Sequence, residues 1–420
     1  MRRGDSQTGC ESDVSCFFGS PALEFWNRSM WRLRQQLSCT TSGSSMHVRL
    51  FTPGPVAVPE DVLRVLSEQV LPHRSEEFQQ VLGPVHHRLQ QLWESAEPVV
   101  VLTSSGTGGI EAVTAHLVPP GSRVVVVTGG RFGEHCAQIV ERTGAEVVRL
   151  SVPWGEVVAP ERLQEVVRSH QPVHAVWLVY SETSTGALQE VQQCAVALRE
   201  VSDAFLCVDA ITAVGVHPCP LDAWGLDAVV AASQKAFFLP PGLAFVGLSR
   251  RAWEYVRQHP SRSLYFDLRV AYERWQEAMT AWTPAVSLIR ALAYVLQRYF
   301  ADGFPPHWER HRRYARAVRA ALATYGLSVF GQAGSHAVTV VELPEALRGL
   351  PQQLRERFHL WVAGGQGILQ GRVMRIGHMG ALSPADILTL ITAVGLLLRE
   401  AGRPVSIERA LEQAHQELWG

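Results

Sequence analysis

Residues 208–245 read VDAITAVGVHPCPLDAWGLDAVVAASQKAFFLPPGLAF, and they contain two short apolar runs. The first run ends in Asp209, and the second ends just before Ser233, Gln234 and Lys235. Apolar runs of this length, bounded by turn residues, are typical of buried strands in a parallel or mixed sheet. Because open α/β sheets bind their ligands at strand ends, Asp209 and Lys235 are candidate functional residues.

A lysine that closes a buried strand can have either of two roles. Its ammonium group can reach solvent or pair with an acid, as most isolated lysines do. Alternatively, a partly desolvated amine loses its proton easily and condenses with an aldehyde to form a Schiff base. The aldehyde cofactor pyridoxal phosphate needs such a lysine, an acid that keeps its ring nitrogen protonated, and donors for its phosphate.

The string Ser-Gln-Lys-Ala-Phe-Phe-Leu-Pro-Pro-Gly at residues 233–242 resembles the lysine motif of the class V aminotransferases. These include the alanine–glyoxylate and serine–pyruvate aminotransferases, and matching motifs extend from about Arg49 to about Gly380. The resemblance implies an α/β protein of the pyridoxal-phosphate-dependent transferase fold type I. Such a protein has a large domain with a mostly parallel, seven-stranded sheet covered by helices, and a smaller C-terminal α+β domain. It also implies a homodimer with shared active sites.

Length and composition limit the other classes of protein. A chain of 420 residues can form two domains, and 38 Lys+Arg nearly balance 39 Asp+Glu, which gives no indication of a nucleic acid or membrane partner. No apolar run approaches the roughly 18 residues of a membrane span. The seven cysteines are irregularly spaced without a Cys-x-x-Cys motif, which argues against disulfides or a metal site and favours the reducing cytoplasm.

The chain divides into three parts by its residue pattern. Residues 1–45 are rich in Ser, Thr, Gly and Cys without periodicity, and we interpret them as a disordered or spurious extension. Residues 46–300 are expected to form an N-terminal arm and the large cofactor-binding domain, because short apolar strands alternate with helical patterns. Residues 301–420 predict a small domain, with strands near 338–341 and 373–376 and helices near 351–358 and 384–399.

A glycine-rich turn is the candidate phosphate site. The string SSGTGG at residues 104–109 follows a predicted strand and precedes a predicted helix. Backbone N–H groups at a helix N-terminus bind anions, although a simple tight turn would use the same residues. The resemblance assigns Ser105, Gly106 and Thr107 to the phosphate, and Gln234 to a phosphate or hydroxyl contact beside the lysine.

The cofactor ring needs an acid at its nitrogen. Asp209 ends a buried run, whereas Asp222 and Asp227 are interpreted as a turn residue and a strand-entry residue. The family's Asp-Ala-Ile/Val-Ser/Thr motif selects Asp209 and implies that Ile211 packs under the ring.

Two further strings resemble family motifs that contact the ring. Residues 129–134, GGRFGE, resemble a motif whose aromatic side chain stacks on the pyridine, a contact worth about 1 kcal/mol. That assigns the stacking role to Phe132, which by itself could equally be a core residue. Residues 181–186, SETSTG, imply a hydrogen bond from Thr183 to the ring hydroxyl.

Three predicted residues remain: two for the substrate, and one for the phosphate of the cofactor. Arginine binds a carboxylate with two parallel hydrogen bonds, and Arg375, in a string resembling the family's Arg-Ile-Gly, is the predicted clamp. Gly54, in Pro-Gly-Pro, would line the substrate entrance. Thr283, before Pro284, resembles a position that reaches the phosphate from the neighbouring subunit, but it could equally cap the following helix.

We therefore expect a transaminase that moves an amino group from alanine or serine to glyoxylate or pyruvate through a Lys235 Schiff base, with Asp209 as the second catalytic residue. Other pyridoxal-phosphate chemistry on the same fold, such as a cysteine desulfurase or a lyase, stays open, as does a non-catalytic pyridoxal-phosphate-binding subunit. Desulfuration needs a mobile nucleophilic cysteine. Residues Cys136, Cys194, Cys207 and Cys219 fall in predicted helices, a strand or a turn rather than in such a loop.

Overall fold

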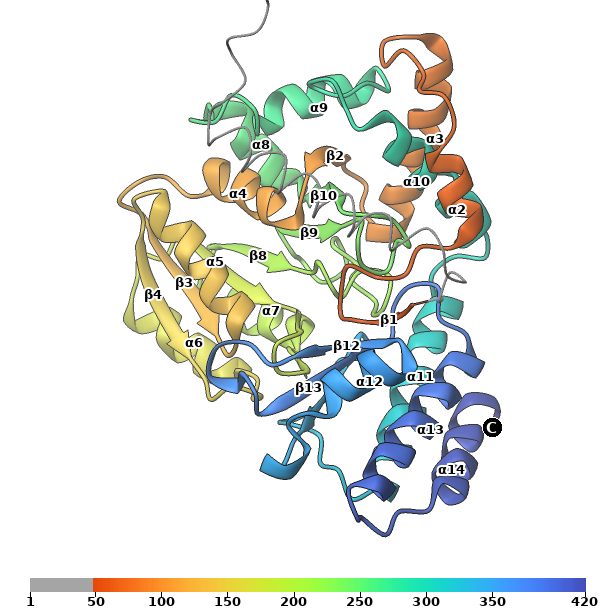
Figure 1. The fold of residues 1–420 in the computed structure, drawn as a ribbon. Coiled ribbons are helices and arrows are strands. Elements are labelled where there is room, and N and C mark those ends of the chain that lie inside the picture. Colours follow the sequence, from red (N-terminus) through yellow and green to blue (C-terminus); the bar gives the residue numbers. More distant parts are fainter. Residues whose placement is uncertain (1–47) are drawn as a thin grey trace, which may run out of the picture. The chain divides into compact units, whose positions relative to one another are not determined.

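The computed structural model describes residues 48–420, which contain a large sheet of seven strands in the order β2-β10-β9-β8-β5-β3-β4 (Figure 1). These strands are β2 (Val99–Ser104), β3 (Arg123–Thr128), β4 (Glu146–Ser151), β5 (Ala175–Val179), β8 (Phe205–Asp209), β9 (Ala228–Ala232) and β10 (Gly242–Leu248). Strands β4, β3, β5, β8 and β9 pair in parallel, and β10 pairs antiparallel with both β9 and β2. The predicted mostly parallel sheet is confirmed.

Helices cover both faces of this sheet. Alternate residues of each strand enter two different cores, so that Val124 and Val126 pack on one side and Val125 and Val127 on the other. The first core includes α4 (Gly106–Leu117), α5 (Arg131–Arg142), α8 (Arg250–Gln258) and α9 (Leu268–Gln276). The second includes α3 (Glu76–Trp93), α6 (Pro160–Ser169), α7 (Val191–Arg199) and α10 (Val286–Arg298). Burial on both faces explains why these strands are continuous runs of valine and alanine.

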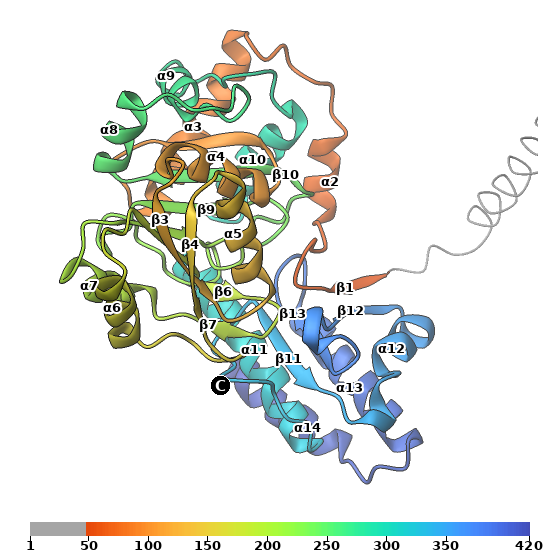
Figure 2. The same ribbon diagram turned by 90° about the vertical axis from the view of Figure 1, so that its left-hand side faces the viewer.

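A second sheet has four strands in the order β1-β12-β13-β11. Its strands are β1 (Arg49–Phe51), β11 (Val338–Glu342), β12 (Leu360–Gly364) and β13 (Val373–Gly377). A core of its own joins this sheet to α11 (Pro305–Thr324), α12 (Leu350–Phe358), α13 (Pro384–Glu400) and α14 (Ile407–Trp419). Strand β1 from the N-terminal arm pairs in parallel with β12, as Figure 2 shows. Sequence analysis predicted β11, β13, α12 and α13, but not β1, β12 or α14.

The remaining elements are short or connect the two sheets: α2 (Glu60–Leu66), β6 (Ser181–Glu182), β7 (Ala187–Leu188), η1 (Glu345–Leu347) and η2 (Gly367–Leu369). Residues 48–420 form one compact unit, so the domain division at residues 300/301 stays a prediction. The interpretation of residues 1–45 as an extension lies outside the described residues. Within the described part, no helix combines the length and the apolar character that crossing a membrane requires.

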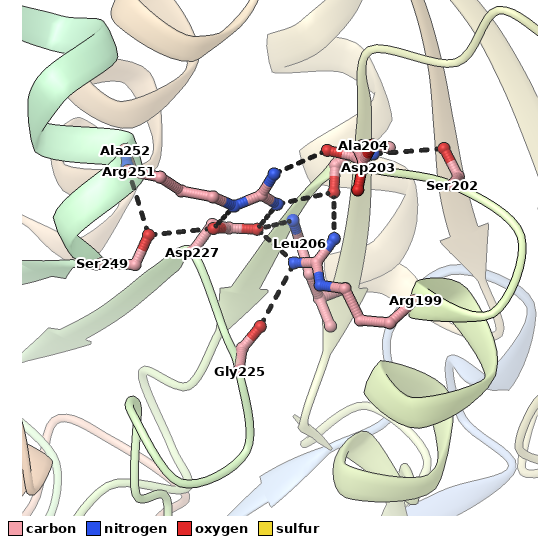
Figure 3. Close-up of polar contacts among 10 residues, drawn as sticks. All are labelled: Arg199, Ser202, Asp203, Ala204, Leu206, Gly225, Asp227, Ser249, Arg251 and Ala252. Atoms are coloured by element: carbon pink, nitrogen blue, oxygen red, sulfur yellow. Dashed lines mark hydrogen bonds and ion pairs between the residues drawn. The ribbon is translucent and has the colours of Figure 1, made fainter.

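A buried carboxylate ties several elements together at the edge where β8 and β9 begin (Figure 3). Asp227 directly precedes β9, and its side chain is almost fully buried. It accepts hydrogen bonds from Arg199 (2.5 Å), from Nε and Nη2 of Arg251 (2.6 and 2.5 Å), from the backbone N–H of Leu206 (2.7 Å) and from Ser249 (2.9 Å). The carboxylate therefore joins α7 and α8 to the starts of β8 and β9, which supports a structural role for this acid.

We predict that Asp227→Asn lowers the free energy of unfolding by about 3 kcal/mol, because the amide removes the buried charge that both arginines pair with and turns an NH₂ group toward some of the hydrogen-bond donors. Chemical denaturation of the purified protein measures this change. The neighbouring Asp203 is exposed, so Asp203→Asn is the matched control and should change stability little. A loss below about 1 kcal/mol in Asp227→Asn would contradict the structural role.

Candidate active site

The ends of five strands bring the predicted site residues together. Because β10 runs antiparallel to both β9 and β2, the ends of β2, β3, β5, β8 and β9 all lie at one edge of the sheet. The loops after them surround a pocket, as expected for an α/β sheet. Its lining comprises Ser105, Gly106, Thr107, Ile110, Phe132, His135, Val179, Ser181, Asp209, Ile211, Thr212, Gln234 and Lys235.

Lys235 is buried three residues after β9, with 9% of its surface exposed. Its Nζ donates a hydrogen bond to the backbone oxygen of Pro53, 2.8 Å away. Burial lowers the pKa of Lys235 to about 8, although the charge of Asp209 raises it and the charge of Arg375 lowers it further. Lys235 is also the only lysine among the 420 residues. The amine is therefore easily made neutral, which Schiff-base formation requires.

Asp209 is the last residue of β8 and is buried in the same pocket. Burial is the largest influence on the pKa of Asp209 and raises it to about 7. The charge of Glu182 also raises this pKa, whereas the hydrogen bond from the backbone N–H of Ile211 (3.0 Å) and the charge of Lys235 lower it. The Sγ of Cys136 lies 4.0 Å from the other carboxylate oxygen. A buried carboxylate with few partners gains stability from a protonated ring nitrogen placed against it.

The N-terminus of α4 faces the pocket at the predicted phosphate site. Ser105 is the N-cap residue, with an extended backbone and no capping bond from its side chain. Gly106 is required by close approach, because a Cβ there would lie 2.4 Å from Cδ1 of Ile211. Thr107 Oγ1 lies 3.4 Å from Nε2 of His135. Backbone N–H groups at a helix start, next to a hydroxyl, suit a phosphate group.

Gln234 provides a test of whether the pocket fits the cofactor. Its Oε1 is buried and has no hydrogen-bond partner among the described residues. Buried polar atoms are normally paired, so an orphaned amide oxygen at the lining of this pocket fits a ligand that donates a hydrogen bond to it. An amine, an acid, a helix N-terminus and an unpaired amide oxygen around one pocket together fit pyridoxal phosphate.

Three of the predicted site residues lie outside the pocket lining but next to it. Gly54 packs against Lys235, since a Cβ on this residue would lie 2.5 Å from Nζ, and its φ of +130° favours glycine. Arg375 is buried in β13, and its Nε donates to the Gly364 oxygen (2.7 Å). The backbone oxygen of Thr183 accepts a bond from Arg375 Nη1 (3.3 Å), while the proposed contact from the Thr183 hydroxyl to the ring stays a prediction.

Thr283 lies in a different hollow, whose lining includes Thr103, Tyr265 and Trp282. The interpretation of Thr283 as a helix N-cap is wrong, because α10 begins at Val286 and its N-cap residue is Ala285. The two intervening residues move the threonine out of capping range. The contribution of Thr283 to a neighbouring subunit's phosphate site stays a prediction.

Glu182 is the residue that sequence reasoning missed. It lies in the SETSTG string, is buried, and accepts hydrogen bonds from the backbone N–H groups of Phe132 (2.9 Å) and Gly133 (3.1 Å). The sequence did contain one signal for it: a charged residue in a segment that follows a buried strand, where charged side chains are rare unless they are paired. Its partners are about 50 positions away, so local patterns could not identify them.

The geometry describes an enzyme that binds pyridoxal phosphate at the strand ends of an α/β sheet, and comparison with known proteins agrees. The family described as Aminotransferase class-V matches residues 50–343. The chain belongs to this family and is a pyridoxal-phosphate-dependent aminotransferase.

Three similar proteins show the range of relatives. The chain is 34% identical to a soluble hydrogenase small subunit of Synechococcus sp. (strain PCC 6716), covering 84% of this chain and 93% of that protein. It is 30% identical to an L-aspartate–glyoxylate aminotransferase of Paracoccus denitrificans, covering 87% and 95%. The crystal structure of an alanine–glyoxylate aminotransferase from Nostoc sp. has a TM-score of 0.80 and 30% identity, covering 84% of this chain and 96% of that one.

We predict that Asp209→Asn stabilises the cofactor-free protein at pH 8 but not at pH 4. The folded-state pKa of about 7 lies above the ordinary value of 3.8, so the ionised carboxylate costs stability above pH 7. This cost falls as the pH drops from 7 to 3.8 and is absent below. Thermal unfolding of both proteins across this pH range measures the difference. Equal melting temperatures of the native protein and Asp209→Asn at pH 8 would contradict the claim that ionisation of the buried Asp209 costs stability.

Proposed function

We propose that this aminotransferase moves an amino group from alanine or serine to glyoxylate or pyruvate, with Lys235 holding the cofactor through a Schiff base. The observation that carries the proposal is the placement of the only lysine in the chain, buried in the same pocket as Asp209. Arginine cannot replace it, because a guanidinium group stays protonated and does not condense with aldehydes under these conditions.

The roles of the side chains follow from their surroundings. Pyridoxal phosphate, when bound, supplies a ring that withdraws electrons from the amino acid's α-carbon. Asp209 keeps the ring nitrogen protonated. The Nζ of Lys235, with its pKa lowered to about 8, accepts the α-proton of the amino acid and later donates a proton back. Its hydrogen bond to the Pro53 oxygen holds the amine at the pocket.

The charges near Lys235 support a donor with a single carboxylate. The charged groups that shift the pKa of Lys235 are Asp209 and Arg375, which places one arginine within electrostatic range of the reacting amine. One guanidinium group matches one substrate carboxylate. Both aminotransferase relatives reported above are named for glyoxylate, one with aspartate and the other with alanine as donor. One carboxylate contact from Arg375 suffices for alanine or serine as the donor.

Two alternatives differ in what they require. A desulfurase needs an accessible cysteine, whereas the four described cysteines are all buried, and burial raises the pKa of each thiol. A non-catalytic subunit is suggested by the name of the Synechococcus relative. Activity measurements separate all three.

We predict that the purified enzyme, loaded with pyridoxal phosphate and mixed with alanine, releases one pyruvate per chain while its cofactor absorbance shifts. Lys235→Ala should lower this rate by about a thousandfold, because the proton-transferring amine is lost. Stopped-flow absorbance and pyruvate assay report the two events. Release of elemental sulfur from cysteine, with alanine as the other product, would favour desulfuration, and an unchanged cofactor spectrum with every amino acid tried would favour a non-catalytic subunit.

We also propose a homodimer in which Thr283 of one chain reaches the phosphate site of the other. The hollow that holds Thr283 is lined by Thr103, two residues before Ser105, and by Tyr265, which is 49% exposed; the adjacent Leu264 is 78% exposed. Large exposed apolar side chains next to a site are typical of a protein interface. A cytoplasmic location is a further proposal, which rests on the unpaired cysteines.

A mixing experiment tests the shared site. The variants Lys235→Ala and Thr283→Val should each have low activity alone. A mixed dimer would contain one site with its own Lys235 and the other chain's intact Thr283. We therefore expect activity to rise above that of either variant after denaturation and joint refolding. No rise on mixing, with dimers present by sedimentation, would place Thr283 within its own chain's site or outside the site.

A further inference from the structure

The carboxylate of Glu182 is saturated with hydrogen bonds from donors. Its Oε2 accepts from the backbone N–H groups of Phe132 (2.9 Å) and Gly133 (3.1 Å). Its Oε1 accepts from the backbone N–H of Ser184 (3.0 Å) and from the Ser184 hydroxyl (2.6 Å). The side chain is buried, so each of these bonds is made without competition from water.

These bonds cap α5 from a distant part of the chain. A helix leaves its first N–H groups without partners, and the N-cap residue of α5 is Gly130, which has no side chain to offer. Instead Ser184 Oγ accepts from the N–H of Arg131 (3.0 Å), and Glu182 accepts from the next two N–H groups. Gly130 admits the carboxylate, since a Cβ there would lie 2.4 Å from Cγ of Glu182. Negative charge at this end also matches the helix dipole.

The chemistry of the partners requires a carboxylate rather than an amide. The three backbone N–H groups can only donate, and the Ser184 hydroxyl donates to Glu182 because an ionised carboxylate can only accept. A glutamine would aim its NH₂ group at one or more of these backbone N–H donors, whichever way the amide is turned. Burial raises the pKa of Glu182, while the bonds from Ser184, Gly133 and Phe132 lower it.

The same turn also contacts the predicted substrate clamp. The backbone oxygen of Thr183 accepts a hydrogen bond from Nη1 of Arg375 (3.3 Å). The same Nη1 also donates to Oε1 of Gln366, and Nε of Arg375 donates to the Gly364 oxygen. The charge of Glu182 raises the pKa of Arg375, against the effect of burial. Residues 182–184 therefore touch both the helix that carries Phe132 and the strand that carries Arg375.

We propose that Glu182 is a positioning residue: through one turn it sets Phe132 against the cofactor ring and Arg375 against the substrate carboxylate. The proposal rests on the proposed function for the roles of Phe132 and Arg375. It adds that these two contacts, one from helix α5 and one from strand β13, depend on a single buried carboxylate outside the lining of the pocket.

The variants Glu182→Gln and Ser184→Ala test this role, with Asp227→Asn as the matched control. The control disturbs an equally buried acid at the opposite edge of the same sheet, away from the pocket. For each protein we would measure the dissociation constant of pyridoxal phosphate, the circular dichroism induced in the bound cofactor, and KM and kcat for alanine. A merely structural role lowers the amount of folded enzyme, and hence kcat per chain, without changing the other quantities.

We expect Glu182→Gln to weaken pyridoxal phosphate binding by about tenfold or more, the effect of losing one charge-assisted hydrogen bond. It should also reduce the induced circular dichroism and raise KM for alanine. Ser184→Ala should change each quantity in the same direction but less, because Glu182 keeps its two bonds to α5. Asp227→Asn should leave the dissociation constant, the dichroism and KM unchanged.

Two results would overturn the proposal. Either the Glu182→Gln enzyme keeps the native dissociation constant, dichroism and KM, or Asp227→Asn changes them as strongly as Glu182→Gln does. If Glu182→Gln does not fold, Ser184→Ala decides by the same criteria. A native protein that binds pyridoxal phosphate but converts no amino acid would instead refute the proposed function, leaving the cofactor measurements to test Glu182.

Discussion

The structure depends on keeping a buried amine and a buried acid together in one pocket. Burial disfavours both charges, so it lowers the pKa of Lys235 to about 8 and raises that of Asp209 to about 7. Their mutual attraction limits both shifts without removing them. The pair is therefore poised near neutral pH: the amine is easily freed of its proton, and the acid gains from a cationic ring nitrogen. A stable protein would not keep such a pair without a use for it.

The fold makes this pairing possible by directing several strand ends to one edge. The predicted phosphate loop follows β2, Phe132 follows β3, Asp209 ends β8, and Lys235 follows β9. The N-terminal arm connects the second sheet to the site. Its strand β1 pairs with β12, and Pro53, two residues after β1, accepts the hydrogen bond of Lys235. Gly377 at the end of β13 lets the arm pass closely, since a Cβ there would lie 2.2 Å from the Thr52 oxygen. The predicted cofactor residues and the predicted substrate clamp Arg375 thus belong to different sheets, and hydrogen bonds from Lys235 to Pro53 and from Arg375 to Thr183 connect them.

Much of the large sheet could be predicted because its signals are local. Strands buried on both faces appear as continuous apolar runs, so Asp209 and Lys235 could be placed at strand ends from the sequence. Strands β1 and β12 could not be predicted, because each is short and exists through pairing across about 300 residues. Sequence analysis offered Thr283 as the N-cap of a helix because threonine before proline is a common capping signal. In the structure the helix begins three residues later, at Val286. The role of Glu182 depends on partners about 50 positions away, and the pKa shifts depend on burial, which only the folded chain defines.

The most direct test is to reduce the complex with pyridoxal phosphate using borohydride and to measure the mass of the intact chain. Because the chain has a single lysine, the α-amino group is the only other primary amine that borohydride could trap, and the labelled peptide distinguishes the two. We predict one reduced pyridoxyl phosphate group per chain, located on the peptide that contains Lys235, and none on Lys235→Arg. Attachment at another position in the native protein, or native-rate transamination by Lys235→Arg, would contradict the central role of this amine.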